Sequence, residues 1–574
     1  MAAPAVVQPP IVRAAALRRL LSARNLIVVG VTLLVAYLAL VPIGFLLWQT
    51  FVHGGHFTLD SFRTAYSDAG LFDMTMNSFA FAIGSTTMAI VLGTGLAHLV
   101  VRTDVPFKAL MFGASLVPLI IPGILHTIAW FFLLSPQIGV LNLHLIRPLT
   151  GHDFNVTSIP GMILVEGLHL TPLVFLLMVA SFRSMDPSLE ESAIMSGAPL
   201  RKVFFRITLP LARPALYAAI LIMAVRTLES FEVPAVLGLN QHIWVFTSRI
   251  WSTLNAVPPD YSTAGAYAMS LLVLTTIGVF WHGRLTKRSR SYQTVTGKGF
   301  RPRPIPLGKW KWPATALIFA YFIISVVLPI AILFYASVQR FYAPPTGYTL
   351  THGTWDNYKA VFDDPLVRHG FKNSLILGLG SASVVMLIAA VASWIVVRTK
   401  LRGRWLIDSL AFLPLTIPGL VLGVAILSIY LRTPWLPIYG TLWILFIAYL
   451  TRYIPYGMRY SSTSMFQIGR ELEESAQMSG AGWFQVFRRI VLPLLVPGFV
   501  AGWIYIVIVS VRELGSSVLL YSPGREVLSI AIWEMWRNGQ FPELCALGIL
   551  MVSGLVILVG IAYKLGARIG VREA

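Results

Sequence analysis

Charged side chains that could contact an ion interrupt two otherwise apolar stretches of this 574-residue chain. Arg226, Glu229 and Glu232 lie in one stretch, and Arg512 with Glu513 lie in another. Ionisable groups in such stretches are costly to bury, and they usually face a cavity or a partner. In a helix the first three residues would share one broad face, at i, i+3 and i+6. Carboxylates suit hard cations, so the pattern predicts an ion pathway, with any transient metal contact at Glu229 and Glu232.

A purely structural role would explain the same charges. Arg226 could pair with Glu229, while Arg512 and Glu513 could find partners across an interface, because neighbours in a helix cannot point the same way. Weaker pathway candidates by the same reasoning are Arg452, Tyr453 and Glu166, which lie in other apolar stretches. Basic residues would also suit an anionic substrate such as a phosphonate. Charge alone therefore does not choose between a metal ion and an organic anion.

The chain that carries these charges has the composition of a membrane protein. Hydrophobic residues make up 56% of the sequence and charged residues only 12%, where a soluble protein has about 25% charged residues. A bilayer span takes roughly 20 predominantly apolar residues. We therefore predict an all-α polytopic protein with about twelve spans, at 26–50, 77–101, 109–134, 160–182, 214–236, 263–282, 313–336, 373–397, 406–430, 441–460, 497–522 and 542–564.

The distribution of basic residues predicts the orientation of these spans. Lys and Arg outnumber Asp and Glu by 44 to 24, and the segment 284–312 is rich in basic residues without one acidic residue. Cytoplasmic loops of membrane proteins carry an excess of Lys and Arg. Both termini are therefore predicted to be cytoplasmic.

The sequence also repeats itself, which predicts two homologous six-span halves, 1–283 and 313–574, joined by a basic cytoplasmic linker at 284–312. A longer external loop in the first half, around 135–160, explains why the offset between the copies changes along the chain. Two halves of the same orientation should pack around an axis along the membrane normal. The repeated motifs are Asn77-Ser78 and Asn373-Ser374, Val101-Arg102-Thr103 and Val397-Arg398-Thr399, and Pro118-Leu119-x-x-Pro122-Gly123 and Pro414-Leu415-x-x-Pro418-Gly419.

The most specific repeat lies between the fourth and fifth spans of each half, in the loops 183–213 and 461–496. Each copy reads Leu-Glu-Glu-Ser-Ala-x-Met-Ser-Gly-Ala and is followed by Ile-x-Leu-Pro at identical spacing. The pattern predicts a short amphipathic helix, a glycine turn and a basic helix that ends where proline marks re-entry into the membrane. Small residues permit close backbone approach, so each helix could dock in a groove of a soluble partner. The contact residues would be Glu190, Glu191, Ser192, Ala193 and Gly197, and Glu473, Glu474, Ser475, Ala476 and Gly480.

These loops resemble the EAA loop of permease subunits in binding-protein-dependent ABC importers, with Glu-Ser-Ala in place of Glu-Ala-Ala. The fused halves, the Pro-Leu-x-x-Pro-Gly motifs and the segments 230–234 and 454–459 resemble most the ferric iron branch of that family. The resemblance implies two coupling helices, each received by one of two ATP-binding subunits whose closure alternates access to a central pathway. It also implies a bacterial inner-membrane protein that takes ferric iron from an extracytoplasmic substrate-binding protein.

The chain itself is not expected to be an enzyme. It has no G-x-x-x-x-G-K-[ST] phosphate loop, so ATP and Mg²⁺ would be used by the separate ATP-binding subunit. No cofactor and no nucleic acid are expected in this chain. The histidines lack metal-ligand spacing, so no stable metal site is expected, and His126 and His169 are interpreted as packing or hydrogen-bonding residues.

Two alternatives remain for the function. Related permeases import thiamine, polyamines or 2-aminoethylphosphonate, so an organic ion is the alternative substrate. A secondary transporter driven by an ion gradient would also have twelve spans in two parallel halves. Such a transporter would have no use for two matched docking loops.

Overall fold

The computed structural model of the protein is almost entirely helical, apart from a short antiparallel pair of strands, β1 (Val52–His53) and β2 (His56–Phe57). It describes residues 23–53, 55–289, 304–399 and 401–568; the first 22 residues and the middle of the linker, 290–303, lie outside these ranges. In the first half the helices are α2 (Ala23–Phe51), α3 (Asp60–Tyr66), α4 (Leu71–Arg102), α5 (Lys108–Leu116), α6 (Gly123–Leu134), α7 (Arg147–Thr150), α8 (Ile159–Ser184), α9 (Ser188–Met195), α10 (Leu200–Val203), α11 (Leu209–Leu211), α12 (Arg213–Glu229), α13 (Phe246–Leu254) and α14 (Tyr261–Ser289). In the second half they are α15 (Lys311–Phe322), α16 (Leu328–Ser337), α17 (Gly347–Thr351), α18 (Asp356–Asp363), α19 (Pro365–Arg398), α20 (Arg404–Phe412), α21 (Gly419–Leu431), α22 (Leu442–Gln467), α23 (Glu471–Met478), α24 (Trp483–Val486), α25 (Leu492–Val511), α26 (Ser517–Leu520), α27 (Leu528–Arg537) and α28 (Phe541–Arg568).

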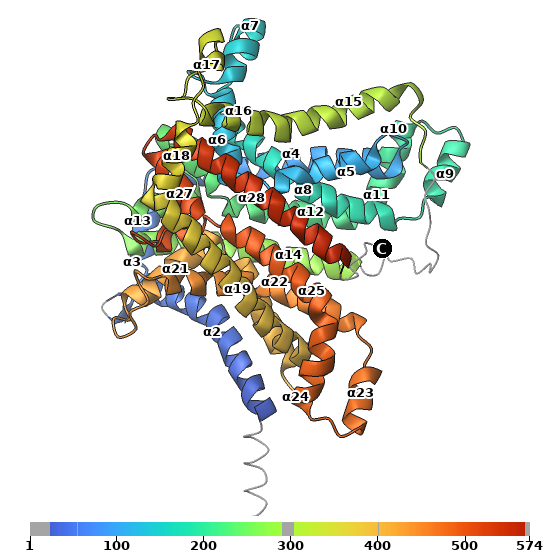
Figure 1. Ribbon diagram of the computed structural model, residues 1–574, viewed down its shortest axis with the longest axis vertical. Helices are drawn as coiled ribbons and strands as arrows, with labels where there is room; N and C mark the ends of the chain where they lie inside the picture. Colours follow the sequence, from blue (N-terminus) through green and yellow to red (C-terminus); the bar gives the residue numbers. More distant parts are fainter. Residues whose placement is uncertain (1–22, 54, 290–303, 400, 569–574) are drawn as a thin grey trace, which may run out of the picture.

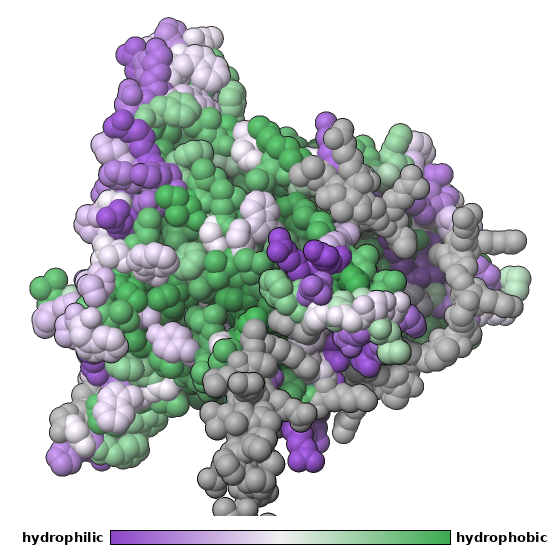
Figure 2. All heavy atoms as spheres, turned by 60° about the horizontal axis from the view of Figure 1, so that its bottom comes forward, coloured by the Kyte–Doolittle hydropathy of each residue, from purple (hydrophilic) through white to green (hydrophobic). Residues whose placement is uncertain are grey.

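Eight helices in the described part of the chain are long and apolar enough to cross a membrane, or eleven if each of three sharply bent helix pairs counts as one span. Figure 2 shows a broad hydrophobic surface over the middle of the molecule, with hydrophilic residues gathered along its left margin. The prediction of an all-α protein with many spans is confirmed. The tenth predicted span, 441–460, corresponds to none of these, because α22 falls outside the count and carries two arginines within its sequence.

Two predicted spans, 109–134 and 406–430, are broken rather than straight. The chain bends by 96° between α5 and α6 and by 105° between α20 and α21, at the two Pro-Leu-x-x-Pro-Gly motifs. Pro122 and Pro418 precede the second helix of each pair with extended ψ angles of 138° and 142°. A proline has no N–H to continue a helical hydrogen-bond ladder, which explains why the helix stops there.

Each break is completed by a side chain from the other half of the molecule. Arg512 Nη1 donates to the carbonyl of Leu119 at 2.5 Å, and Thr275 Oγ1 donates to the carbonyl of Thr416 at 3.1 Å. Irregular backbone within a membrane protein needs such internal partners, because lipid offers none. The two breaks therefore bind the halves to each other.

The repeated Asn-Ser motif makes the same contact in each half. Ser78 Oγ accepts the N–H of Phe246 at the start of α13, at 3.1 Å. Ser374 Oγ accepts the N–H of Leu528 at the start of α27, at 2.8 Å. Free N–H groups at a helix start need an acceptor, so this sequence repeat preserves a structural contact.

The described end of the linker, from residue 304 onward, packs on the end of α4. The N–H of Ile305 donates to the carbonyl of Arg102 at 2.8 Å, and the N–H of Leu307 donates to Asp104 Oδ1 at 2.9 Å. Lys311 Nζ lies 3.6 Å from Asp104 Oδ2. The Leu307 N–H, with help from Lys311, holds the pKa of Asp104 below its ordinary value.

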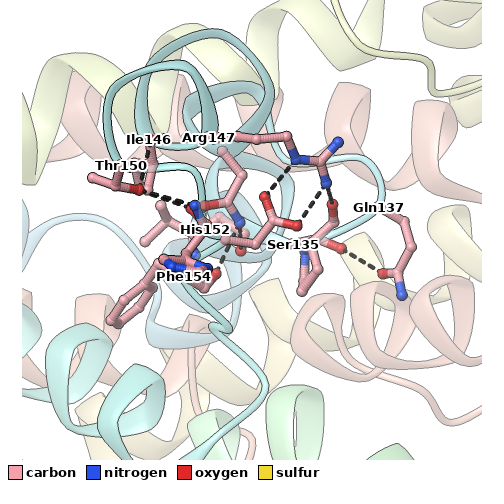
Figure 3. A network of polar contacts seen from close by, with 11 residues as sticks. Ser135, Gln137, Ile146, Arg147, Thr150, His152 and Phe154 are labelled. Carbon is pink, nitrogen blue, oxygen red and sulfur yellow. Dashed lines mark hydrogen bonds and ion pairs between the residues drawn. The ribbon is translucent and has the colours of Figure 1, made fainter.

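The longer loop of the first half forms a braced projection, shown in Figure 3. Arg147 holds both carboxylate oxygens of Asp153, at 2.8 and 2.6 Å, and also donates to the carbonyl of Pro136. Asn142 Nδ2 donates to the carbonyls of Leu134 and Phe154, at 2.7 and 2.8 Å. The loop is therefore a rigid insertion rather than a loose connection.

A segment of the second half joins this projection. The ring of Tyr342 stacks on Phe132 with centroids 4.1 Å apart, and its hydroxyl donates to the carbonyls of Phe132 and Ile138. In Figure 1, α7 and α17 lie at the top of the view, far from α9 and α23 at the right and lower right. We call the residues 142–155 and 341–353 together the tip.

Candidate functional site

A polar cavity of about 220 Å³ lies where the broken helices of the two halves meet. Leu119 and Gly123 of the first break line it, as does Gly419 of the second. Its charged lining residues are Glu166, Arg226, Glu229, Glu232, Arg452, Arg512 and Glu513, so all six predicted pathway residues meet there. The sequence predicted these six lining residues, but not the cavity between the two halves that brings them together.

The local structure of these residues differs from the sequence prediction. Helix α12 ends at Glu229, the next residue is extended with ψ 125°, and Glu232 begins a new helical turn ahead of Pro234. Glu232 therefore does not share a helical face with Arg226 and Glu229. The helix stops where Ser230 leaves the helical conformation. The carbonyl of Ser230 accepts a hydrogen bond from Thr247 Oγ1 at 2.7 Å.

Arg512 and Glu513 also lie outside a helix, immediately after α25 ends at Val511. The argument that neighbours in a helix cannot face one site does not apply to them, and both line the cavity. The helix at the predicted span 497–522 therefore ends earlier than predicted, at Val511.

The charged groups have well-defined partners. Arg452 Nε lies 3.0 Å from Glu513 Oε2, which also accepts from Tyr453 at 3.2 Å. Arg226 donates to the hydroxyl of Tyr456 in the other half at 2.9 Å. The structural alternative of an Arg226–Glu229 ion pair is absent among the described contacts, whereas Arg512 does reach across to the first half.

Two glycines allow the breaks to approach these charges closely. A Cβ atom added at Gly123 would overlap Glu232 Oε2, and one added at Gly419 would lie 2.9 Å from Arg452 Nη1. Real Cβ atoms do not come within 3.0 Å of a non-bonded heavy atom, so neither position has room for a side chain as the charged groups now lie. The repeated Pro-Gly motifs thus place a carboxylate against one break and a guanidinium against the other.

A second cavity of about 250 Å³ lies next to the first and is mostly apolar. Four residues line both cavities: Arg226, Glu229, Arg452 and Tyr456. They form a partition that contains the Arg226–Tyr456 hydrogen bond between the halves. Any solute that moved from one cavity to the other would have to separate these groups.

The two EAA-like segments form the short helices α9 and α23, as predicted. Each helix exposes one leucine and one methionine at equivalent positions: Leu189 and Met195 are 55% and 83% exposed, and Leu472 and Met478 are 51% and 90% exposed. Ser192, Gly197, Glu474, Ser475 and Gly480 are exposed, and Glu191, Ala193 and Ala476 are half-buried.

Glu190 and Glu473, in contrast, face the protein interior. Glu190 Oε2 lies 3.6 Å from Arg102 Nη1, and Glu473 Oε1 lies 2.8 Å from Arg398 Nε, with all four side chains buried. Arg102 also donates to the carbonyl of Met185, and Arg398 to that of Ile468. We call these two arrangements the Arg–Glu clamps, which fix α9 to α4 and α23 to α19.

Gly197 and Gly480 occupy the turns that end α9 and α23. Their φ angles are +80° and +84°, in the left-handed region, and a Cβ at either site would meet open space. Glycine is favoured there because other residues pay a steric cost for positive φ. The backbone conformation, rather than crowding within this chain, requires glycine at these turns.

Several residues of the site were not identified from the sequence. Arg102 and Arg398 were recognised only as repeat markers, although a repeated arginine at the end of an apolar stretch is a usable signal for a buried partner. Leu119 was recognised only as part of a repeated motif and Tyr456 only within the segment 454–459, since the partners that give them their place in the site are distant in sequence. In the described part of the chain, no group of three or more His, Cys, Asp or Glu side chains could hold a metal ion.

Comparisons with known proteins agree with this geometry. The family model described as "Binding-protein-dependent transport system inner membrane component" matches residues 85–291 and again residues 385–569, once in each half. The repeat predicted from short motifs therefore extends over both halves.

Named relatives transport different ions. The Fe(3+)-transport system permease protein FbpB 2 of Haemophilus influenzae is 26% identical over 494 residues, which cover 84% of this chain and 88% of that protein. The ferric transport system permease protein FbpB of Actinobacillus pleuropneumoniae is 25% identical over 70% of this chain and 57% of its own length. The putative 2-aminoethylphosphonate transport system permease protein PhnV of Salmonella paratyphi A is 29% identical over 43% of this chain and 92% of its own length.

Proposed function

Because the chain belongs to the family of binding-protein-dependent transport system inner membrane components, we propose that it is the fused permease of an ATP-driven importer that moves ferric iron into the cytoplasm. The observation that carries this proposal is the pairing of two EAA-like helices with one charged cavity between the halves. The similarity to two ferric permeases over most of the chain supports iron as the substrate.

The coupling to ATP would act through α9 and α23. Two equivalent helices, each with an exposed leucine and methionine, suit two copies of one ATP-binding subunit. The Arg–Glu clamps would transmit movement of these helices to α4 and α19, which are long enough to reach across the membrane. ATP and Mg²⁺ would be bound by that partner subunit and not by this chain.

The opposite end of the molecule would receive one substrate-binding protein. The tip lies far from α9 and α23 (Figure 1) and exposes Leu149 and Tyr348, at 76% and 70%. We propose that α9 and α23 face the cytoplasm and the tip faces outward. Twelve spans, cytoplasmic termini and a division into 1–283, 284–312 and 313–574 complete this proposal.

The runner-up substrate is an organic ion, favoured by the arginines in the cavity and by the similarity to the PhnV permease. The cavity volume favours a small solute, since sites for drug-sized ligands measure roughly 300–1,000 Å³. Thiamine is disfavoured on this ground. A ferric ion or 2-aminoethylphosphonate is small enough to be considered.

The experiment that tests the proposal measures uptake in cells that express this chain with its ATP-binding subunit and its substrate-binding protein. ⁵⁵Fe³⁺ is compared with labelled 2-aminoethylphosphonate, thiamine and spermidine, each with an intact and a disabled ATPase. We expect iron uptake that requires the ATPase. Uptake of an organic ion alone would replace iron as the substrate, and uptake that ignores the ATPase would overturn the proposal.

A further inference from the structure

The two halves contribute opposite charge to the walls of the 220 Å³ cavity. The first half supplies Glu166, Glu229 and Glu232 against a single arginine, Arg226. The second half supplies Arg452 and Arg512 against a single carboxylate, Glu513. We call these the acidic wall and the basic wall.

This polarity is not a consequence of the sequence repeat. Helices α8 and α22 have the same length and each has a proline at its fourteenth residue, so their sequences align at one constant offset. At that offset Tyr449 occupies the position of Glu166, and Arg452 occupies the position of His169. The two halves have therefore acquired different charges at equivalent places around one cavity.

Both walls contain polar atoms that make no hydrogen bond or ion pair among the described contacts. Among the described contacts, Glu229 and Glu232 accept no hydrogen bond and form no ion pair within 4.0 Å. A guanidinium has five N–H donors, and the described contacts use only Nε of Arg452 and Nη1 of Arg512. Arg512 is nonetheless close enough to Glu232 to attract it electrostatically.

Neither a bare cation nor a simple anion matches such a cavity. A bare trivalent cation would meet two arginines on the basic wall, and a simple anion would meet three carboxylates on the acidic wall. Charges of one sign in a site of restricted hydration repel strongly. A solute that carries a positive centre and an oxyanion together would satisfy both walls, with bidentate contacts available from each guanidinium.

We propose that the cavity accepts a substrate in which a positive centre and an oxyanion travel together, the positive centre against Glu229 and Glu232 and the oxyanion against Arg452 and Arg512. The inference rests on the proposed function. For an iron importer it means that the ferric ion passes with an oxygen-donor anion still bound. A zwitterionic phosphonate has the same chemistry, and the experiment below separates the two sources.

The first test uses the complete complex with its binding protein in proteoliposomes, with ATP on the side of the ATP-binding subunits. ⁵⁵Fe³⁺ is supplied with [³²P]phosphate, and [¹⁴C]2-aminoethylphosphonate is supplied separately. We expect ³²P to enter with ⁵⁵Fe at a comparable molar amount, or 2-aminoethylphosphonate to enter by itself if that is the source. Entry of ⁵⁵Fe without ³²P would overturn the inference.

The second test asks whether Glu232 and Arg512 contact the solute or only each other. Glu232→Gln and Arg512→Gln should each lower uptake at least tenfold, whereas Arg512→Lys, which keeps the charge and a donor for Leu119, should retain most of it. The double variant Glu232→Arg with Arg512→Glu reverses the local polarity and restores opposite charges. It should remain defective if the walls contact the solute.

Recovery of uptake by the double variant would overturn the inference, because it would show that the two charges serve only to attract each other. Each variant is first checked for its amount in the membrane and for a monodisperse size-exclusion profile, so that misfolded variants are set aside. Arg512→Lys and the dual-label measurement then still decide the outcome. If the unmodified complex shows no ATP-dependent uptake of either probe, the proposed function fails rather than this inference alone.

Discussion

At the scale of single residues, Gly123 has no side chain and so leaves the space that the Glu232 carboxylate occupies. A Cβ at this position would overlap Glu232 Oε2, which is the movable end of a flexible side chain. The protein can therefore accommodate alanine by displacing the carboxylate, and the effect should fall on transport more than on folding.

We predict that Gly123→Ala lowers substrate uptake at least fivefold, with a change of less than about 1 kcal/mol in stability, as expected when only an accessible side-chain end moves. The matched control is Gly95→Ala, since a Cβ at Gly95 in α4 meets nothing within 4 Å. ATP-dependent uptake and thermal unfolding of both variants are compared. Equal uptake by the two variants would show that the position of Glu232 is unimportant.

Asp104 makes the docking of the linker depend on pH. Its pKa is depressed by the Leu307 N–H and by Lys311, so the stabilisation is complete above the ordinary value of 3.8 and is lost as the pH falls below it. We predict that hydrogen exchange of the Leu307 amide accelerates below about pH 4, relative to an unstructured reference. Asp104→Asn should weaken protection at neutral pH and remove the pH dependence; an unchanged profile would contradict the assignment.

At the scale of elements, the turns after α9 and α23 require a backbone conformation that glycine adopts most easily. A left-handed conformation costs an ordinary residue roughly 1–2 kcal/mol, and asparagine tolerates it better than most. A β-branched residue is worse still. The geometry therefore predicts which replacements preserve the turns after α9 and α23.

We predict that Gly197→Val with Gly480→Val abolishes uptake and stimulated ATP hydrolysis while the chain stays in the membrane. Gly197→Asn with Gly480→Asn is the matched control and should retain a large part of both activities, since a Cβ meets open space at each position. Normal uptake by the valine variant would contradict the assignment of α9 and α23 as coupling helices. Equal loss in both variants would point to a contact with the partner instead of backbone conformation.

The Arg–Glu clamps should matter for stability because they are buried. Removing one member of a buried ion pair costs about 3–5 kcal/mol, since the other charge stays without compensation. We predict that Glu190→Gln and Glu473→Gln each lower the thermal unfolding midpoint of the purified complex. Glu474→Gln, at an exposed neighbouring position, should leave the midpoint unchanged, and an equal effect of all three would contradict the clamp.

At the scale of the whole molecule, the tip breaks the approximate two-fold relation between the halves. Its two segments lie in different halves, and Tyr342 of the second segment contacts Phe132 and Ile138, which precede the first segment in the chain. If the tip faces outward, as proposed, its asymmetry would allow a binding protein to dock in one orientation only. The tip is thus a candidate for the element that orients the incoming partner.

We predict that Leu149→Ser with Tyr348→Ser weakens stimulation of ATP hydrolysis by the binding protein at least fivefold. The control is Leu33→Ser in α2, which removes a 64% exposed apolar side chain elsewhere on the molecule. Stimulation is measured as a function of binding-protein concentration, so that a loss of affinity is separated from a loss of maximal rate. A shift of equal size in both variants would argue against the tip.

The sequence alone was sufficient for the properties that depend on local composition. Runs of apolar residues predict membrane helices because hydropathy is a property of each stretch. The repeated motifs predict two homologous halves and a short helix in each, and both features are present. It also singled out Arg226, Glu229, Glu232, Arg452, Arg512 and Glu513, because charges are rare in apolar stretches.

Only the tertiary structure decided how those charges are arranged. Glu232 lies beyond the end of α12 at Glu229, and Glu513 lies beyond the end of α25 at Val511. Helical periodicity therefore could not predict the directions of these two side chains. The buried direction of Glu190 depends on Arg102, which lies far away in sequence, and the capping of Leu119 depends on Arg512 in the other half. Burial and charge pairing are set by contacts between distant segments, and for that reason the fold determines them and the local sequence does not.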